Sequence, residues 1–420
     1  MRPPETLASD QNFSFRHECF ENGRVVYEGA ASERLDVELN RRANIGERLV
    51  VGIAFAHNDA THSDWVGDVS VIVLLDDDLD RTHERQYATG EVLQCPPMPT
   101  AAPPVRPVTL DEIYAARERI RGVITRTPLI KLRHDSPAPD IWLKLDNLQP
   151  INAFKIRGAA NAVAMLTPDE RAKGVWTISA GNAGQGVAYA ARAYGIPCTV
   201  VTIETAPETK IERMRNLGAR IVKAPFDAAW RAMEQRAFEG VEGSFIHPFD
   251  DHNFIAGNAS LGLEILEDLP EVRTVIAAIG GGGLVSGIGS SIRQLAPSVR
   301  ILGAEPETAA PGAKSFEAGS PQVFDDFQPS FVDGAGGKSV FPRMWERMQG
   351  IVDGSIVVTL DETKRAMRLV AEKVRVIAEG AGALAVAAAL SGRAGEGPIV
   401  AVISGGNIDL KKFAELIGAA

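Results

Sequence analysis

Cysteine is almost absent from this sequence. Only three cysteines occur among 420 residues, at Cys19, Cys95 and Cys198. Because they are odd in number and widely scattered, they do not form a disulfide framework or the close spacing of a metal-binding site. We therefore expect free thiols in a reducing compartment, and we predict a cytoplasmic protein.

Basic residues are fewer than acidic residues. The chain has 44 Lys and Arg against 54 Asp and Glu, a net charge of -10, which disfavours nucleic acid and anionic membranes as partners. No apolar run is long enough to span a bilayer, and the polar N-terminus lacks the apolar centre of a signal peptide. A hydrophobic content of 45% and a charged content of 23% are instead typical of a soluble globular protein of two or three domains.

Residues 1–94 show the patterns of β-strands. The stretches Phe13–Phe15 and Arg24–Tyr27 alternate apolar and polar side chains, whereas Arg48–Phe55 and Val69–Leu75 are apolar enough to be buried strands. We expect a small, mainly β module in this region. Nothing in its sequence indicates a function.

Four possible metal ligands, His57, Asp59, His62 and Asp64, lie between the last two of these strands. Imidazole and carboxylate groups bind several cations, so a metal site is conceivable here. A polar surface loop is the simpler interpretation, because connections between strands normally run through solvent. We therefore predict no metal site.

A proline-rich stretch marks the clearest boundary in the chain. Six prolines fall between Pro96 and Pro107. Proline cannot donate to a backbone ladder and tends toward extended geometry. We interpret residues 95–107 as a linker that separates the N-terminal module from residues 108–420.

Strand and helix patterns alternate from residue 108 onward. Apolar runs separated by amphipathic stretches predict parallel sheets that are covered on both faces, with ligands at the carboxyl ends of the strands. The expected strands are 174–178, 198–201, 220–223, 274–279, 300–304 and 399–403. The expected helices are 109–120, with Thr109 or Asp111 as its N-cap, and 185–194, 209–217, 228–238, 284–295, 362–374 and 381–390.

Four consecutive glycines, Gly280–Gly283, follow one of these strands and precede a helix. Bare glycine backbone lets several N–H groups point at one anion, and the helix dipole favours negative charge, so the turn suits a phosphate monoester. A tight turn between close-packed elements is the alternative. The stretch Gly380–Ala385 fits a loose dinucleotide-binding pattern, but we interpret it as the small-residue start of a helix. The chain has no G-x-x-x-x-G-K-[ST] loop, which disfavours a P-loop ATPase.

Lys155 stands between Phe154 and Ile156, where a turn at Gln149–Pro150 leads into a helix-forming run. A lysine with two apolar neighbours is unusual for a solvated helix face. In one interpretation its stem packs while its amine reaches water. In the other, a desolvated amine loses its proton and forms a Schiff base with a carbonyl compound.

Four motifs follow one another along the chain. They are Ala153–Ala159 around the lysine, Ser179–Gly186, Gly280–Gly283 and Ser404–Asn407. In this order and spacing they resemble the fold-type II pyridoxal-phosphate enzymes, and in particular the threonine/serine dehydratase family, which includes serine racemase. The resemblance covers Val108 to the C-terminus and leaves the N-terminal module unrelated.

The resemblance implies an α/β fold of the tryptophan synthase β type, with two open twisted parallel-sheet domains after the mainly β N-terminal module. The large domain is expected to comprise about residues 108–173 and 251–420, and the small domain about residues 174–250. A homodimer is expected from the family.

The resemblance also implies roles for single residues. Lys155 would bind pyridoxal 5'-phosphate covalently, and Phe154 would pack on the cofactor ring. Asn182 would hydrogen-bond the 3'-oxygen of the ring, and Ser404 would face its pyridine nitrogen. The cofactor phosphate would be held by Gly280, Gly281, Gly282, Gly283 and Leu284. The substrate carboxylate would be held by the helix start that comprises Ser179, Gly181, Asn182 and Ala183.

By the same resemblance the chain is expected to be a lyase that converts a 3-hydroxy amino acid, such as threonine or serine, to a 2-keto acid and ammonia. Lys155 would remove the Cα proton, and the β-hydroxyl would leave with help from the cofactor phosphate. The hydroxyl of Ser404 stabilises a charged ring less than a carboxylate does, which favours elimination over transamination. Two alternatives stay open, namely a β-replacing synthase of the cysteine synthase type and a non-catalytic protein that binds the cofactor.

Three departures from the family bear on the substrate, the reaction or a metal ion. Ala183 and Gly184 replace a histidine and an alanine, so we expect a roomier pocket that admits a bulkier substrate such as phenylserine. Ala180 replaces the second serine of serine racemase, so racemisation should be weak. Glu305 matches the first ligand of a divalent-cation site found in some relatives, but Pro311 occupies the place of the second, which puts that metal in doubt.

Overall fold

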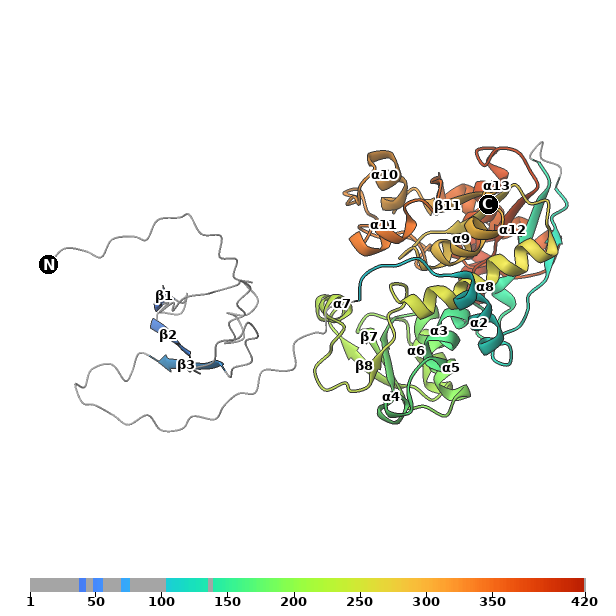
Figure 1. The fold of residues 1–420 in the computed structure, drawn as a ribbon. Helices are drawn as coiled ribbons and strands as arrows, with labels where there is room; N and C mark the ends of the chain where they lie inside the picture. The colour runs from blue at the N-terminus through green and yellow to red at the C-terminus, as the bar shows by residue number, and fades with distance from the viewer. Residues whose placement is uncertain (1–37, 43–47, 56–68, 76–102, 135–138, 419–420) are drawn as a thin grey trace, which may run out of the picture. The chain divides into compact units, whose positions relative to one another are not determined.

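The computed structural model describes residues 38–42, 48–55, 69–75, 103–134 and 139–418. The chain divides into two units, Met1–Met98 and Pro99–Ala420, and each is considered by itself (Figure 1). In the first unit three strands form an antiparallel sheet, in the order β1 (Glu38–Arg42), β2 (Arg48–Phe55) and β3 (Val69–Leu75).

Two of these strands, β2 and β3, coincide with strands expected from the sequence. The other two expected strands, Phe13–Phe15 and Arg24–Tyr27, lie outside the described residues. The same holds for the four possible metal ligands His57, Asp59, His62 and Asp64. The mainly β module and the boundaries at residues 94 and 107 therefore stay predictions.

The larger sheet of the second unit has six strands in the order β12-β11-β10-β13-β5-β4. Neighbouring strands run parallel, except that β4 pairs antiparallel with β5 at one edge. The strand bounds are β4 (Leu129–Lys131), β5 (Ile141–Lys144), β10 (Thr274–Ala278), β11 (Arg300–Pro306), β12 (Gly354–Val358) and β13 (Ile399–Val402). Because β5 pairs with β13, the sheet joins segments from the beginning and the end of this unit.

The smaller sheet has four parallel strands in the order β8-β7-β6-β9. They are β6 (Val175–Ile178), β7 (Cys198–Ile203), β8 (Arg220–Ala224) and β9 (Ser244–Phe245). All four lie between residues 174 and 250. The division of the unit into a large and a small domain at these residues stays a prediction.

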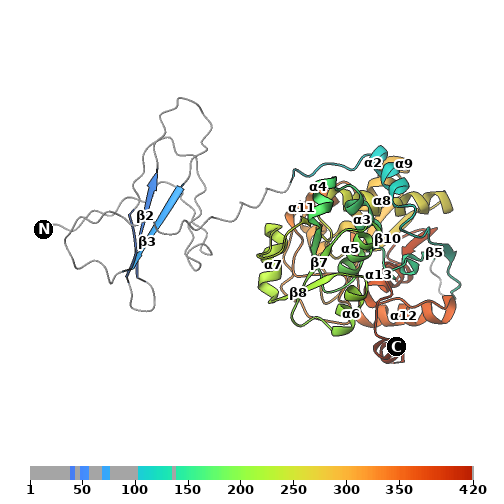
Figure 2. The same ribbon diagram turned by 90° about the horizontal axis from the view of Figure 1, so that it is seen from below.

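Helices connect the strands. Their bounds are α2 (Leu110–Ile120), α3 (Lys155–Ala164), α4 (Pro168–Lys173), α5 (Asn182–Ala193), α6 (Glu208–Asn216), α7 (Phe226–Gln235), α8 (His252–Asp268), α9 (Gly283–Leu295), α10 (Pro311–Ala318), α11 (Pro342–Met348), α12 (Leu360–Val374), α13 (Gly380–Leu390) and α14 (Leu410–Gly418). In Figure 1, α5, α6 and α7 gather with β7 and β8 in the lower part of the second unit, whereas α12, α13 and β11 lie in its upper part. Figure 2 shows the same elements from below, where the two groups overlap.

Both faces of the larger sheet are buried. Ile276 and Leu302 point to the face covered by α12 and α13, whereas their neighbours Val275 and Ile301 point to the face covered by α8 and α9. Strands with two buried faces have continuous apolar runs, which is why the sequence predicted β10, β11 and β13. The strands β4, β5 and β12 were not among those expected. The α/β architecture of parallel sheets covered on both faces is as expected.

The sequence did not predict α8. Its buried residues occupy every side of the helix between Phe254 and Ile265, so it has no polar stripe to set a helical period. Two further boundaries were misplaced, because α5 begins three residues before the expected Gln185, and α7 begins at Phe226 rather than at residue 228. The expected cap of the first helix is confirmed, since Thr109 forms a capping box with Glu112.

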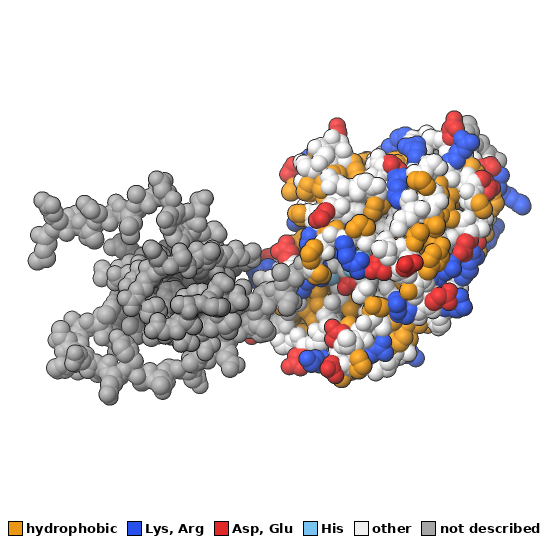
Figure 3. Space-filling view, in the orientation of Figure 1, with side chains coloured by type: hydrophobic (Ala, Val, Ile, Leu, Met, Phe, Trp, Pro, Cys, Tyr) orange, Lys and Arg blue, Asp and Glu red, His pale blue; other side chains and the backbone are white. Residues whose placement is uncertain are grey.

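Charges of both signs are mixed on the face of the second unit shown in Figure 3. Within the described part of the chain, none of the helices is long and apolar enough to cross a membrane. Cys198 is buried, and burial raises the pKa of its thiol to about 12, so the thiol is unreactive.

Candidate active site

Lys155 is the first residue of α3, and its amine lies among aromatic rings. Nζ is 5.3 Å from the centre of the Phe154 ring and 5.6 Å from that of Phe254. The amine donates a hydrogen bond of 2.6 Å to the carbonyl oxygen of Pro248. Burial lowers the pKa of the Lys155 amine to about 8. An appreciable fraction of the amine is therefore neutral near physiological pH, as a nucleophile or base requires.

The segment after β13 lies beside the lysine. The N–H of Phe154 donates to the carbonyl oxygen of Ser404 at 2.9 Å, and Ala153 pairs with Gly405 in an isolated β-bridge. Ser404 is only 4% exposed, and its hydroxyl has no hydrogen-bond partner among the described residues. The hydroxyl is thus free to bond to a ligand in the site.

Asn182, the first residue of α5, is held by two side chains from other elements. Its amide nitrogen donates to Oε1 of Glu379 at 2.7 Å, and its amide oxygen accepts from Nδ2 of Asn407 at 2.8 Å. The two bonds fix the orientation of the amide and leave one N–H for a further acceptor. Gly405 makes room for them, since a Cβ there would lie 2.3 Å from Oε1 of Glu379.

Glu379 is a candidate site residue that the sequence analysis missed. It is 6% exposed, and burial, with a smaller contribution from the charge of Asp333, raises the pKa of its carboxyl to about 7. In the sequence it ends a charged stretch and begins a helix, α13, as many glutamates do. Only its tertiary contact with Asn182 sets it apart.

The other candidate substrate-binding residues lie in the first turn of α5 or just before it. Oγ of Ser179 accepts a hydrogen bond of 3.0 Å from the N–H of Gly181. The helix has no side-chain cap, so no side chain occupies the N–H groups of its first turn, which include those of Asn182 and Ala183. These groups are available to an anion, which the helix dipole also attracts.

Gly184 lies between buried side chains and Ser179, whose Cβ is 3.4 Å from the place of a Cβ on Gly184. A Cβ at this position would lie 2.5 Å from Sδ of Met214 and 3.1 Å from Cγ1 of Val200. Both side chains belong to the buried cluster beneath the smaller sheet. Met214 therefore occupies most of the space that an alanine would fill, and Ala183 is the stronger candidate for a larger pocket.

The glycines Gly280–Gly283 join β10 to α9. A Cβ on Gly281 would lie 2.2 Å from the ring of Phe249, and one on Gly282 would lie 2.9 Å from Sδ of Met348. Gly282 is the N-cap of α9 with a φ of +83°, a conformation that favours glycine. Close packing thus requires glycine here. The helix also has no side-chain cap, which leaves its first N–H groups, that of Leu284 included, available to an anion.

Other helices of the same unit are capped differently. The N-caps of α2, α4 and α12 are Thr109, Thr167 and Thr359, and each forms a full capping box with a glutamate. The N-caps of α5 and α9 are glycines. Helices such as α6 and α13 also lack a side-chain cap, so among the described helices the glycine N-cap is what sets α5 and α9 apart. Each of these two N-termini suits one anionic group.

A buried ion cluster fixes α3 in place. Arg157 is fully buried and donates to both carboxylate oxygens of Asp146 and to both of Glu264, at 2.7–3.0 Å. Glu264 also pairs with the buried amine of Lys144 at 2.8 Å. Sequence analysis named Arg157 only as part of a motif, and its partners are distant in the chain. Since Arg157 lies two residues after Lys155, the cluster holds the lysine's helix turn.

Glu305 acts as a helix cap. Its carboxylate accepts hydrogen bonds from the N–H groups of Gly312 and Ala313 at the start of α10, at 2.8 and 2.7 Å, and from the hydroxyl of Ser355 at 2.7 Å. Among the residues that the structure describes, no group of three or more His, Cys, Asp or Glu side chains gathers to hold a metal ion.

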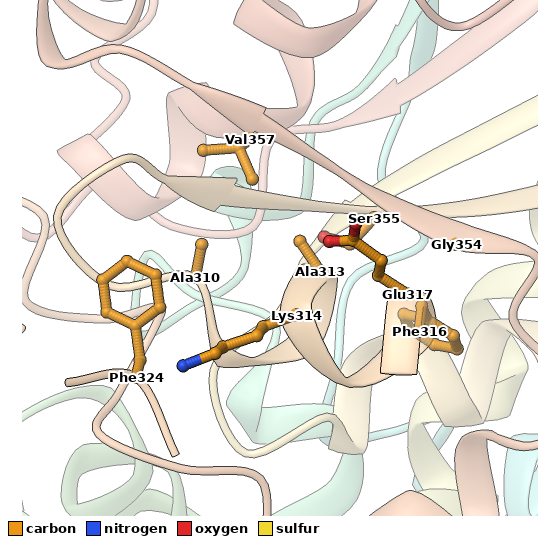
Figure 4. Close-up of a pocket in the computed structure, with 9 residues that line it drawn as sticks. All are labelled: Ala310, Ala313, Lys314, Phe316, Glu317, Phe324, Gly354, Ser355 and Val357. Carbon is orange, nitrogen blue, oxygen red and sulfur yellow. The ribbon is translucent and has the colours of Figure 1, made fainter. Parts of the chain in front are cut away.

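A pocket of about 630 Å³ opens between α10 and β12 (Figure 4). Its wall includes Lys314, Phe324 and Ser355, and none of the four motifs contributes to it. The amine of Lys314 already bonds to the carbonyl oxygen of Val323 and to Asp325. The residues of the four motifs thus lie outside this pocket, and the candidate active site is the one around Lys155.

Comparison with known proteins identifies the family of the chain. The family model described as "Pyridoxal-phosphate dependent enzyme" matches residues 120–405. The chain belongs to this family. The expected fold type is confirmed with it, because solved structures of the family share the fold of the second unit.

The relatives are similar over most of their lengths. An L-threonine ammonia-lyase of Thermotoga maritima is 39% identical over 315 residues, which cover 74% of this chain and 78% of the relative. A catabolic L-threonine dehydratase of Staphylococcus aureus is 37% identical and covers 74% of this chain and 92% of its own. Among solved structures, maize serine racemase superposes with a TM-score of 0.65 at 31% identity, over 75% of this chain and 98% of its own. A threonine deaminase of T.th. superposes with a TM-score of 0.65 at 32% identity. The match covers 72% of this chain and 99% of the deaminase chain.

As a member of this family the protein is a pyridoxal-phosphate-dependent lyase. The residues in the site fit the cofactor. They offer an amine with a lowered pKa for its aldehyde, an uncapped helix N-terminus for its phosphate, and an unpaired hydroxyl at Ser404 for its ring. When bound, the cofactor supplies an electron sink that lets a C–H bond beside the substrate nitrogen ionise.

Proposed function

We propose that this enzyme removes the β-hydroxyl of a 3-hydroxy amino acid and releases a 2-keto acid and ammonia. The relatives named as threonine ammonia-lyase and dehydratase support the reaction class. The observation that carries the proposal is the amine of Lys155, which lies beside two aromatic rings with a pKa lowered to about 8. Keto acid and ammonia formed in equal amounts, without an added nucleophile, test it. Turnover that requires an added thiol would favour a β-replacing synthase instead.

The first turns of α5 and α9 hold the two anionic groups in this proposal. The N–H groups around Asn182 and Ala183 bind the substrate carboxylate, and Gly280–Gly283 with Leu284 bind the cofactor phosphate. Both assignments are supported by helix N-termini that no side chain caps. The remaining amide N–H of Asn182 bonds to the 3'-oxygen of the ring, and Phe154 packs on the ring.

Lys155 carries the cofactor and, once free, takes the Cα proton onto Nζ. The β-hydroxyl then receives a proton, the β C–O bond breaks, and water leaves. Ser404 would hold the ring nitrogen through a neutral hydroxyl, so the ring would have no ionic partner. The cofactor would then be a weaker electron sink, which would favour expulsion of the β-hydroxyl. Ammonia leaves when the released enamine hydrolyses.

We propose that a bulky β-substituent, as in phenylserine, is accepted because Ala183 stands where relatives have histidine. Matched variants test this point. Ala183→His should lower kcat/KM for phenylserine relative to threonine about tenfold or more, since a filled pocket excludes the ring. Gly184→Ala should leave that ratio within about twofold, because this position contacts Met214. An unchanged ratio in Ala183→His would overturn the assignment.

We also propose a cytoplasmic homodimer. The scarcity and scatter of cysteine support the compartment, and the resemblance to the dehydratase family supports the dimer. Light scattering on the purified protein measures the oligomeric state directly. A monomer at working concentration would contradict the second part of this proposal.

A further inference from the structure

The turn His247–Asp250 touches both parts of the site that handle the cofactor. It follows β9 and precedes α8. The carbonyl oxygen of Pro248 accepts the hydrogen bond from Nζ of Lys155 at 2.6 Å. The ring of Phe249 packs where a Cβ on Gly281 would lie, 2.2 Å from it. One turn thus sets the surroundings of the amine and of the glycine loop together.

The turn is shaped from within by His247. Its Nδ1 accepts hydrogen bonds from the N–H of Asp250 at 2.9 Å and from that of Phe249 at 3.3 Å. An acceptor at Nδ1 must be unprotonated, and burial lowers the pKa of His247 to about 3, so the ring stays neutral. The internal bonds close the turn but do not place it in the molecule.

Asp250 anchors the turn from outside. Its carboxylate pairs with Arg236 at 3.0 Å, Arg343 at 2.7 Å and Arg347 at 3.1 Å. Arg236 ends α7, whereas Arg343 and Arg347 belong to α11, so three cations from two helices converge on one acid. Arg343 donates in addition to the carbonyl oxygen of Pro103. Asp250 is 5% exposed, and hydrogen bonds between charged groups at such a site are stronger than those between neutral groups.

Asp251, the next acidic residue, has a different structural role. Oδ1 of Asp251 accepts a hydrogen bond from the N–H of Phe254 and caps α8. Asp250 makes no such bond in a helix, so its three arginines are not explained by secondary structure. The three arginines do hold the residue that directly follows Pro248 and Phe249 in the turn.

We propose that Asp250 is a positioning residue for Lys155, which it serves by holding the Pro248 carbonyl where the free amine docks. The inference rests on the proposed function. When Lys155 acts as the base, the Cα–H bond breaks, a new N–H bond forms at Nζ, and the electron pair stays on the substrate. The ammonium that results donates to the Pro248 carbonyl, which stabilises its charge and holds it in place for the next step.

The first test uses the cofactor-free protein. The rate at which an amine-reactive reagent labels Lys155, followed by mass spectrometry across pH, gives the apparent pKa of this amine. Asp250→Asn keeps the side-chain shape but loses the charge that binds three arginines. The proton affinity of Lys155 should then fall about tenfold, one pKa unit, because the carbonyl no longer stabilises the ammonium. The milder Arg343→Gln should shift it in the same direction by less.

The second test uses the holoenzyme. Asp250→Asn should lower kcat about tenfold while KM stays within about twofold, because one charge-assisted contact at the base is lost and substrate binding is untouched. Asp353→Asn is the matched control, since Asp353 pairs with Arg293 outside the four motifs. It removes one acid from an arginine pair and should change neither kcat nor the titration of Lys155.

The two tests distinguish a failure of the inference about Asp250 from a failure of the proposed function. If Asp250→Asn and Arg343→Gln leave both the titration of Lys155 and kcat as in the unmodified enzyme, Asp250 is only structural and the inference fails. If the unmodified enzyme yields no keto acid, the proposed function fails, and the titration of the cofactor-free protein still decides the role of Asp250.

Discussion

Two features of the surroundings of Lys155 have opposite effects on the charge of its amine. Burial disfavours the charged amine, while the Pro248 carbonyl favours it. Together the two effects keep the pKa of the amine in a range where the amine can both lose and accept a proton. Sequence analysis identified this lysine from its apolar neighbours and its motif, but its acceptor is distant in the chain.

Glu379 is the residue whose charge should influence stability across the physiological pH range. Burial raises its pKa from about 4.5 in an unfolded chain to about 7. The stability that the protonated form contributes is present below about pH 4.5 and is lost as pH rises through 7. Glu379→Gln, which stays neutral, should therefore gain about 1–3 kcal/mol relative to the unmodified cofactor-free protein between pH 5 and 8.

Denaturant unfolding of the two proteins at several pH values measures this gain. The amide oxygen introduced by Glu379→Gln must accept the same hydrogen bond from Asn182, so any pH-independent difference reports a change in that contact. A difference in stability that stays constant from pH 5 to 8 would contradict the titration of Glu379 in this range.

Arg157 is expected to carry much of the local stability around the site. Arg157→Ala leaves Asp146 and Glu264 buried without their shared partner, so unfolding free energy should fall by about 3–5 kcal/mol. Arg126→Ala is the control, because Arg126 forms exposed pairs with Glu267 and Asp268 and should cost less than about 1 kcal/mol. Equal losses in chemical denaturation would refute the special role of the buried cluster.

At the scale of elements, helix starts account for much of what the sequence predicted well or poorly. α2 was placed accurately, because Thr109 and Glu112 form a capping pattern that is visible in the sequence. α5 begins earlier than expected, since Gly181 is its N-cap and glycine gives no capping signal. α9 also has a glycine N-cap, but it begins only one residue before the expected start, because the run of four glycines itself marks the turn.

The glycine loop before α9 yields a prediction at this scale. Gly281→Ala puts a Cβ into the ring of Phe249, so the loop or the ring must move. We expect the dissociation constant of pyridoxal phosphate to rise about tenfold or more, and the unfolding free energy to fall by about 1–3 kcal/mol. Cofactor titration by absorbance and thermal unfolding measure the two effects.

Gly122→Ala is the matched control, since no atom lies within 4 Å of its added Cβ. It should leave cofactor affinity unchanged. If Gly281→Ala binds the cofactor as tightly as this control, the loop does not hold the phosphate in the proposed way.

At the scale of the whole molecule, alternating strand and helix patterns predicted parallel sheets but not their strand order. Nothing in the sequence shows that β5 lies between β13 and β4, although this order brings the motif at Lys155 beside that at Ser404. The four motifs were recognisable because each has its own short pattern. Glu379, Asp250 and Glu264 were not assigned roles, because each acts through a partner far away in the chain.

The central claim is that Lys155 carries pyridoxal phosphate and acts as the base in elimination from a 3-hydroxy amino acid. The most direct measurement combines the absorbance spectrum of the purified protein with keto-acid and ammonia assays on threonine, serine and phenylserine, for the unmodified chain and for Lys155→Ala. The account predicts a lysine-bound cofactor band and keto acid from at least one substrate, with both lost in the variant. A colourless protein, or a coloured one inert toward the whole panel, would contradict it.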